Sequence, residues 1–95
     1  MLNIAVLGCG RIGRMHADNI ARHADAELAM VYDVHVPSAS AVAEQHGVPA
    51  ASSPQDIFSS GYVDAVLVAT TTETHADFIE MAVAAGKPAA AAVPS

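Results

Sequence analysis

Short apolar runs and amphipathic stretches alternate along the chain. The apolar runs are unbroken, as in parallel strands that are buried on both faces. They predict strands over residues 2–7, 26–33, 48–51, 64–70 and 88–93. The stretches between them predict helices over 11–23, 37–46, from 53 onward, and 73–86. Pro37 suits a first helical turn, and Gly47 and Gly86 suit the residue after a helix end.

Alternating strands and helices predict an α/β fold. The connections are expected to be right-handed crossovers, which place a doubly wound parallel sheet between helices on both faces. We expect the strand order 3-2-1-4-5. The 95 residues contain no repeat and no linker, so residues 1–95 are interpreted as a single domain.

A glycine-rich segment, "GCGRIG", follows the first predicted strand and opens the first predicted helix. Gly8 would make the tight turn, and Gly10 would let the backbone approach a pyrophosphate. Gly13 would let the helix pack closely on the strand, and the phosphates would lie against free N–H groups at the helix N-terminus. The alternative is an ordinary glycine-rich turn. Arg11 could either reach a phosphate or face solvent.

An acidic residue closes the second predicted strand, as dinucleotide binding requires. Asp33 stands 20 residues after Gly13, and its carboxylate would accept hydrogen bonds from the adenosine ribose hydroxyls. A 2′-phosphate would meet like charge there, and Val34 and His35 follow in place of an arginine. These residues favour NAD over NADP and predict a Rossmann-type domain. The alternative role for Asp33 is a turn residue or helix N-cap.

A second polar loop, "ATTTETHAD", leaves the fourth predicted strand on the same side of the sheet. Because the topology changes direction between strands one and four, both loops should line one crevice. Thr70 and Thr71 offer hydroxyls to a ribose or phosphate, while Thr72 or Thr74 could simply cap the next helix. His75, in the first turn of that helix, would be neutral and would either contact the cofactor or seal the turn.

Charge and cysteine usage exclude several classes of function. The net charge of −6, with four Lys and Arg residues, argues against nucleic-acid and anionic-membrane partners. The single cysteine, Cys9, is interpreted as a small space-filling residue and suggests a reducing, cytoplasmic setting. No histidine spacing indicates a metal site, and no apolar run has the length of a membrane span.

Three segments carry a family resemblance. They are "IAVLGCGRIGRMHADNIARH", "VYDVH" and "YVDAVLVATTTETHADFIEMAVAAGKP". Together they resemble the N-terminal half of the Gfo/Idh/MocA oxidoreductases, most of all the members similar to inositol 2-dehydrogenase. The resemblance implies an NAD(P)-dependent oxidoreductase that acts on a sugar, inositol or related polyol. It implies a pyrophosphate site at Gly8, Gly10, Arg11, Ile12 and Gly13, a ribose site at Asp33, and a nicotinamide border at Thr70, Thr71 and His75.

The chain departs from this family at its end. Members usually continue to Glu-Lys-Pro, where this sequence has Ala92, Val93 and Pro94. The second, substrate-binding domain of the family is also absent from the sequence. We therefore expect a fragment that binds NAD but is inactive alone, with a substrate domain or another copy as its partner. The alternatives are a stand-alone nucleotide-binding module, an interaction module that pairs through its last strand, and a flavoprotein.

Overall fold

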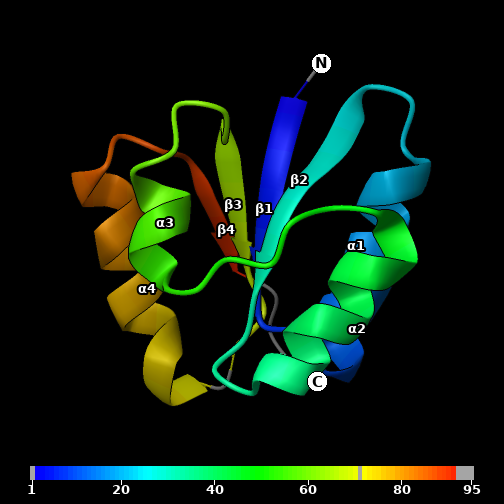
Figure 1. Cartoon of the computed structure of the whole chain (residues 1–95). Helices are drawn as coiled ribbons and strands as arrows, with labels where there is room; N and C mark the ends of the chain where they lie inside the picture. Colours follow the sequence, from blue (N-terminus) through cyan, green and yellow to red (C-terminus); the bar gives the residue numbers. More distant parts are fainter. Residues whose placement is uncertain (1, 71, 92–95) are drawn as a thin grey trace.

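A computed structural model describes residues 2–70 and 72–91 of the chain (Figure 1). Within these residues, the strands are β1 (Leu2–Leu7), β2 (Ala26–Tyr32), β3 (Ala65–Val68) and β4 (Ala89–Ala91). The helices in the same described part are α1 (Arg11–Arg22), α2 (Val36–His46), α3 (Pro54–Phe58) and α4 (Thr72–Ala84). All strand pairs are parallel, in the order β2-β1-β3-β4. The predicted doubly wound α/β fold is confirmed.

The sheet is covered by helices on both faces. One cluster of buried residues joins Ala5 and Leu7 of β1 to Ile57 of α3 and Ala82 of α4. The other joins Val6, on the opposite face of the same strand, to residues of α1 and α2. Successive residues of β1 therefore serve two cores, which explains why the strand is apolar at every position from Ile4 to Leu7.

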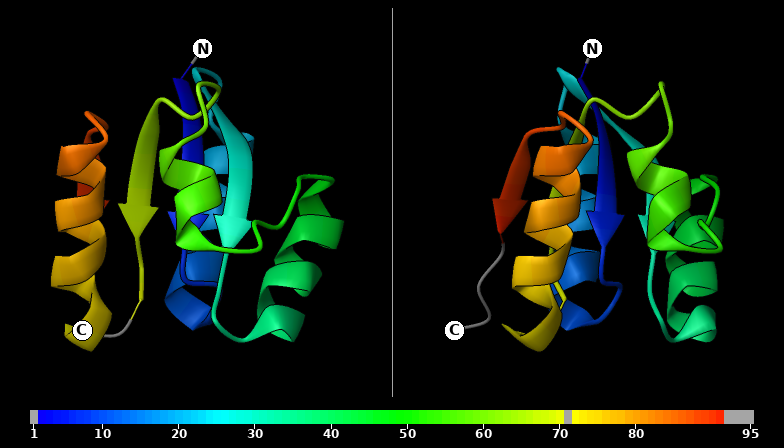
Figure 2. Two further views of the ribbon diagram at one scale, coloured as in Figure 1. Left: turned by 60° about the vertical axis from the view of Figure 1, so that its left-hand side comes forward. Right: turned by 90° about the vertical axis from the view of Figure 1, so that its left-hand side faces the viewer.

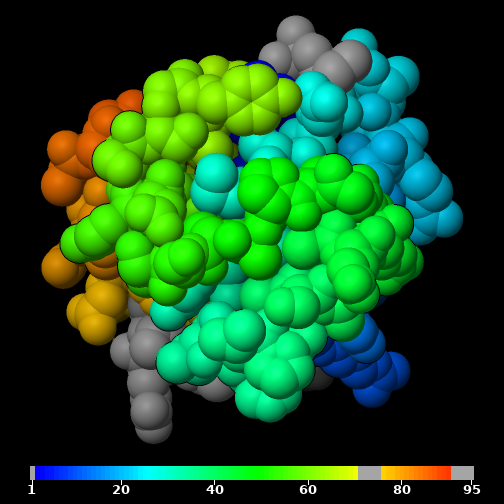
Figure 3. Space-filling model, in the orientation of Figure 1, coloured from blue at the N-terminus to red at the C-terminus, as the bar shows by residue number. Residues whose placement is uncertain are grey.

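The third predicted strand, residues 48–51, is reduced to one parallel bridge between Ala50 and Val31. The Val31 N–H donates to Pro49 O (3.2 Å), and the Ala51 N–H donates to Val31 O (2.8 Å). Pro49 has no N–H to extend the ladder, and α3 begins at Pro54. The segment still lies beside β2, as the predicted order requires. Figure 3 shows α2, α3 and the segment between them as one continuous surface in front of the sheet.

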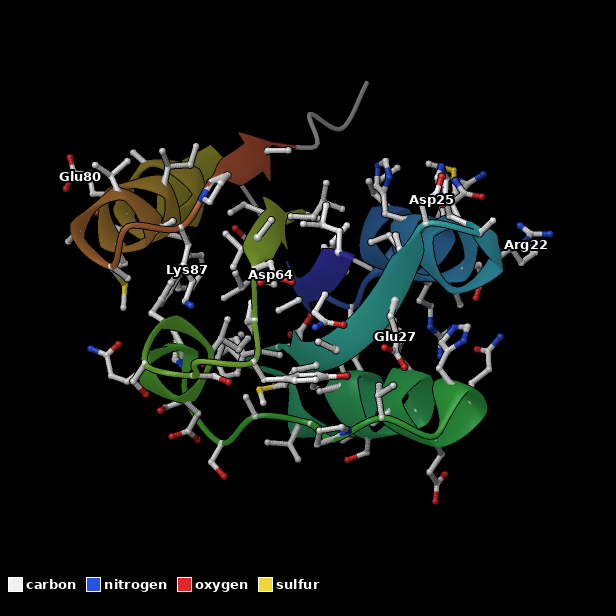
Figure 4. All side chains as sticks on the ribbon, turned by 90° about the horizontal axis from the view of Figure 1, so that it is seen from above. Arg22, Asp25, Glu27, Asp64, Glu80 and Lys87 are labelled. Carbon is white, nitrogen blue, oxygen red and sulfur yellow. The ribbon has the colours of Figure 1, made fainter. Side chains whose placement is uncertain are left out.

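The A-G-K-P segment connects α4 to β4. Gly86 has a φ of +72°, the left-handed conformation that suits the end of a helix. The Lys87 Nζ donates to the carbonyl oxygens of Ser60 (2.8 Å) and Val63 (2.7 Å). Figure 4 shows Lys87 reaching from the end of α4 toward α3. This lysine therefore fixes the loop that leads into β3.

Element boundaries differ slightly from the predicted ones. The fourth predicted strand, 64–70, is ordered as β3 over Ala65–Val68, and the predicted helix 73–86 is α4 over Thr72–Ala84. The last predicted strand, 88–93, is β4 over Ala89–Ala91, and residues 92–95 lie outside the described part of the chain. Within that part, no helix is both long enough and apolar enough to cross a membrane.

Candidate dinucleotide site

The glycine loop lies at the carboxyl edge of the sheet, between the ends of the two neighbouring strands. The Gly8 N–H donates to Tyr32 O at the end of β2 (2.7 Å), and the Ala69 N–H donates to Leu7 O (2.7 Å). The loops after β1, β2 and β3 gather at this edge, at the arrowheads in Figure 2. The first and second loops therefore meet at one edge of the sheet, as predicted.

Two of the three loop glycines are required by the fold itself. Gly8 has a φ of +106°, and a Cβ there would lie 2.6 Å from the Ala69 carbonyl group. A Cβ on Gly13 would overlap the backbone carbonyl oxygen of Gly8. By contrast, a Cβ on Gly10 would meet no atom of the described residues within 4 Å. The space in front of Gly10 is open, as expected where a ligand approaches the backbone.

Within the described part of the chain, the N-terminus of α1 has no side-chain cap. Gly10 is the N-cap residue, and the first turn contains no acidic residue. The Arg14 N–H donates to Gly10 O (2.9 Å), so the amides of Arg11, Ile12 and Gly13 precede the first helical hydrogen bond. Arg11 has an exposed side chain. Such a helix start attracts anions through its amides and its dipole.

Asp33 lies directly against the glycine loop. Its Oδ2 accepts the Cys9 N–H (2.7 Å), and its Oδ1 accepts the His35 N–H (2.8 Å). His35, and not Asp33, is the N-cap residue of α2. The hydrogen bond from His35 gives Asp33 the role of a turn residue, which was the alternative to ribose binding. The hydrogen bond from Cys9 also links Asp33 to the glycine loop. Its ribose role stays a prediction.

A cavity of about 370 Å³ lies between these segments. It is lined by Gly8, Gly10, Tyr32, Asp33, Val34, Ala69, Thr70 and Phe78. The rings of Tyr32 and Phe78 are in an edge-to-face arrangement with centroids 6.5 Å apart. The Thr70 hydroxyl oxygen is buried and has no hydrogen-bond partner within the described part of the chain. The cavity thus combines an apolar wall with the polar residues Asp33 and Thr70.

The structure brings four of the predicted residues, Gly8, Gly10, Asp33 and Thr70, around this one cavity. Thr71 lies outside the described residues, and so does the side chain of His75. Sequence reasoning missed the aromatic pair as cavity residues. Tyr32 immediately precedes Asp33, which could have indicated its position, but Phe78 gave no signal beyond the apolar side of its helix.

A larger apolar groove, of about 540 Å³, lies elsewhere, over the α1 side of β1, β3 and β4. Its polar lining residues are His16, Asn19, His23 and Asp25. It contains none of the glycine-loop residues. The smaller cavity at the carboxyl edge is the candidate site because the helix N-terminus, the acid and the open glycine meet there.

The thiol of Cys9 is expected to be unreactive. Its side chain is only 2% exposed. Burial raises the pKa of Cys9 to about 11, and the Asp33 carboxylate adds to the shift, while Arg14 opposes it. Only the thiolate reacts with alkylating reagents. At pH 8, about one thiol in a thousand would be ionised, so iodoacetamide should react about 100-fold more slowly than with an unfolded cysteine peptide.

The reaction is followed by mass spectrometry, with the same chain unfolded in guanidinium as the control. The folded rate should rise with pH up to about pH 11, because the folded pKa lies there. Equal rates for the folded and unfolded chain at pH 8 would contradict the buried, uncharged thiol.

A glycine loop at a strand-to-helix turn, an acid at the end of the next strand and a cavity at the carboxyl edge define a dinucleotide-binding Rossmann domain. Residues 2–92 match the family model for GFO_IDH_MocA, described as "Oxidoreductase family, NAD-binding Rossmann fold". The chain belongs to this oxidoreductase family. The resemblance drawn from the sequence is confirmed.

Several relatives are inositol dehydrogenases. Inositol 2-dehydrogenase of Rhizobium meliloti is 38% identical over 86 residues, which cover 90% of this chain and 26% of that enzyme. The crystal structure of a myo-inositol dehydrogenase from Corynebacterium glutamicum has 40% identity and a TM-score of 0.89, over 96% of this chain and 27% of the other.

Scyllo-inositol dehydrogenase from Lactobacillus casei, with bound NAD(H) and scyllo-inositol, has 28% identity and a TM-score of 0.87, over 96% of this chain and 27% of the other. The chain therefore spans about a quarter of the length of the relatives that it matches.

Proposed function

We propose that this chain binds NAD at the carboxyl-edge cavity, as the dinucleotide-binding domain of an oxidoreductase that acts on inositol or a related polyol. The observation that carries the proposal is the position of Asp33. Its carboxylate lies against the glycine loop, next to an uncapped helix N-terminus. The inositol dehydrogenases among the relatives support the substrate class.

The residues at the cavity fit a dinucleotide. The open space at Gly10 leaves room for a pyrophosphate, and the amides of Arg11, Ile12 and Gly13 would hold its oxygens. Asp33 would hold the adenosine ribose. Thr70 lines the cavity and would border the nicotinamide side. When bound, the nicotinamide supplies the hydride carrier, and the protein contributes binding and orientation.

We propose NAD and not NADP as the ligand. A 2′-phosphate on the ribose would face the negative charge of Asp33. The next residue, Val34, is 86% exposed and offers no charge, and the His35 ring already bonds the Ser38 hydroxyl (2.7 Å). The bound NAD(H) in the Lactobacillus casei relative supports the same choice.

Replacing Asp33 by Ala should weaken NAD binding by about 10-fold to 100-fold, because hydrogen bonds to a charged group each contribute about 1.5–3 kcal/mol. NADP binding should fall less, because the same change removes a repulsion. Calorimetric titration with NAD, NADP and ADP-ribose measures both effects. Asp25→Ala is the matched control, since this exposed acid lies near the N-terminal end of β2 (Figure 4). An equal loss for NAD and NADP would contradict the ribose role.

We further propose that this chain alone does not turn over substrate. Among the described side chains that line the cavity, only Tyr32 and Asp33 carry an ionisable group, and Asp33 is assigned to the ribose. The positions that match the family's Glu-Lys pair, Ala92 and Val93, carry no ionisable group. A substrate domain or another copy, in the cytoplasm, would complete the enzyme. Formation of NADH from NAD and myo-inositol by the isolated chain would contradict the proposal that the chain alone is inactive.

A stand-alone nucleotide-binding module is the alternative function. The same titrations separate it from the proposed one. Binding of ADP-ribose as tight as that of NAD would favour the module, because the nicotinamide would then contribute nothing.

A further inference from the structure

We infer that Asp33 is also a positioning residue, which holds the glycine loop in its binding shape before any dinucleotide arrives. This role rests on the proposed function only where ligand affinity is concerned. The loop-holding contact itself is present in the chain without a ligand.

The Asp33 carboxylate bridges two segments that are separate in the sequence. Its Oδ2 accepts the Cys9 N–H from the glycine loop (2.7 Å), and its Oδ1 accepts the His35 N–H at the start of α2 (2.8 Å). Both distances are typical of hydrogen bonds in which one partner is charged. The carboxylate therefore ties the loop that would hold the phosphates to the segment that would border the ribose.

Neighbouring hydrogen bonds restrict the part of the glycine loop that depends on the Asp33 carboxylate. On one side, the Gly8 N–H is held by Tyr32 O, and on the other, the Arg14 N–H is held by Gly10 O. The Cys9 N–H lies between them, and its side chain is buried. Without the Asp33 carboxylate, this amide would lose its partner, and a buried amide without a partner destabilises the conformation that contains it. The part of the loop expected to loosen is therefore residues 9–10.

The bridge leaves the carboxylate free to bind a ligand as well. Each carboxylate oxygen can accept about two hydrogen bonds. One is used on each oxygen, so each retains an acceptor position for a ribose hydroxyl. Asp33 can thus hold the loop and the ribose at the same time, and ligand binding does not require the bridge to break.

Asp33→Asn separates the two roles with little change in side-chain shape. Asparagine has a single acceptor oxygen, and its NH₂ group would face one of the two amides. A residue that acts only on the ribose would affect only ligands that carry the adenosine ribose hydroxyls. A residue that positions the loop would affect every ligand whose pyrophosphate binds there.

The first measurement is amide hydrogen exchange by NMR without ligand. In Asp33→Asn, the Cys9 amide keeps at most a neutral acceptor, which holds it about half as strongly as a carboxylate does. It should therefore exchange about tenfold faster than in the unchanged chain, equivalent to about 1.4 kcal/mol of lost protection. The Gly8 amide should be unaffected, because its acceptor is Tyr32 O. Asp25→Asn is the charge-matched control. Asp33→Ala, which removes both acceptors, is the second variant should the asparagine variant not fold, and should show at least as large an increase.

The second measurement compares NAD with its 2′,3′-dideoxyadenosine analogue by calorimetry. If Asp33 positions the loop, Asp33→Asn should weaken the analogue as well, by about fivefold to tenfold. Unchanged Cys9 exchange together with unchanged analogue affinity would overturn the inference, even if NAD itself bound more weakly. Faster Cys9 exchange in a chain that binds neither ligand would support the positioning role and refute the proposed function.

Discussion

Gly13→Ala is expected to destabilise the folded chain by about 3 kcal/mol or more, which would lower the unfolding temperature by roughly 12–24 °C. The added Cβ would overlap the carbonyl oxygen of Gly8. This obstacle is backbone, so no side-chain rotation can relieve it. The Gly8 N–H donates to Tyr32 O, so moving Gly8 would strain the contact between the loop and β2. The expected cost therefore lies at the upper end of the range for overpacking.

Thermal and urea unfolding followed by circular dichroism measure this effect. Gly61→Ala is the matched control, because a Cβ at Gly61 meets nothing within 4 Å. That variant should remain within about 0.5 kcal/mol of the unchanged chain. A Gly13→Ala chain that unfolds within two or three degrees of the original would show that α1 does not pack on the loop as described.

Much of the fold was predictable because the sheet is buried on both faces. Apolar runs such as Ile4 to Leu7 of β1 differ clearly from the amphipathic pattern of helix α1. The reduced third strand was not predictable. Residues 48–51 have the apolar pattern of a strand, but Pro49 has no N–H to donate a hydrogen bond to a neighbouring strand. Whether such a segment pairs fully depends on its neighbour in space, and here only Ala50 forms a bridge with β2.

The candidate site was predictable to the level of its loops. The spacing from Gly13 to Asp33 placed the acid beside the glycine loop, and the structure confirms that proximity through the Cys9 N–H. The sequence could not show that the same carboxylate also bonds His35, because the angle between β2 and α2 decides it. Phe78 enters the cavity only through the packing of α4 on the sheet.

The three loop glycines have separable roles. Gly8 and Gly13 are restricted by contacts within the chain, whereas Gly10 is not. The glycine motif in the sequence suggests a role for each glycine. It does not show which of these glycines the fold itself requires. A substitution at Gly13 should therefore lower mainly the stability of the fold. A substitution at Gly10 should lower mainly the affinity for NAD.

Gly10→Ala should leave stability within about 1 kcal/mol of the original. Gly10 has a φ of −75°, which alanine adopts freely, and the new methyl group would lie in open space. Alanine is a poorer N-cap residue than glycine, but it also reduces the entropy of the unfolded chain, and these effects oppose each other. Thermal unfolding, with Gly61→Ala as the control, checks this half of the prediction.

NAD affinity should nevertheless fall by about 100-fold in Gly10→Ala, equivalent to about 2.7 kcal/mol. The methyl group would occupy the space where the pyrophosphate approaches the amides at the start of α1. Calorimetric titration with NAD and ADP-ribose measures the loss, which should be the same for both ligands because both carry the pyrophosphate. Unchanged affinity in a stable Gly10→Ala chain would place the ligand elsewhere, since the open space at this glycine would then have no part in binding.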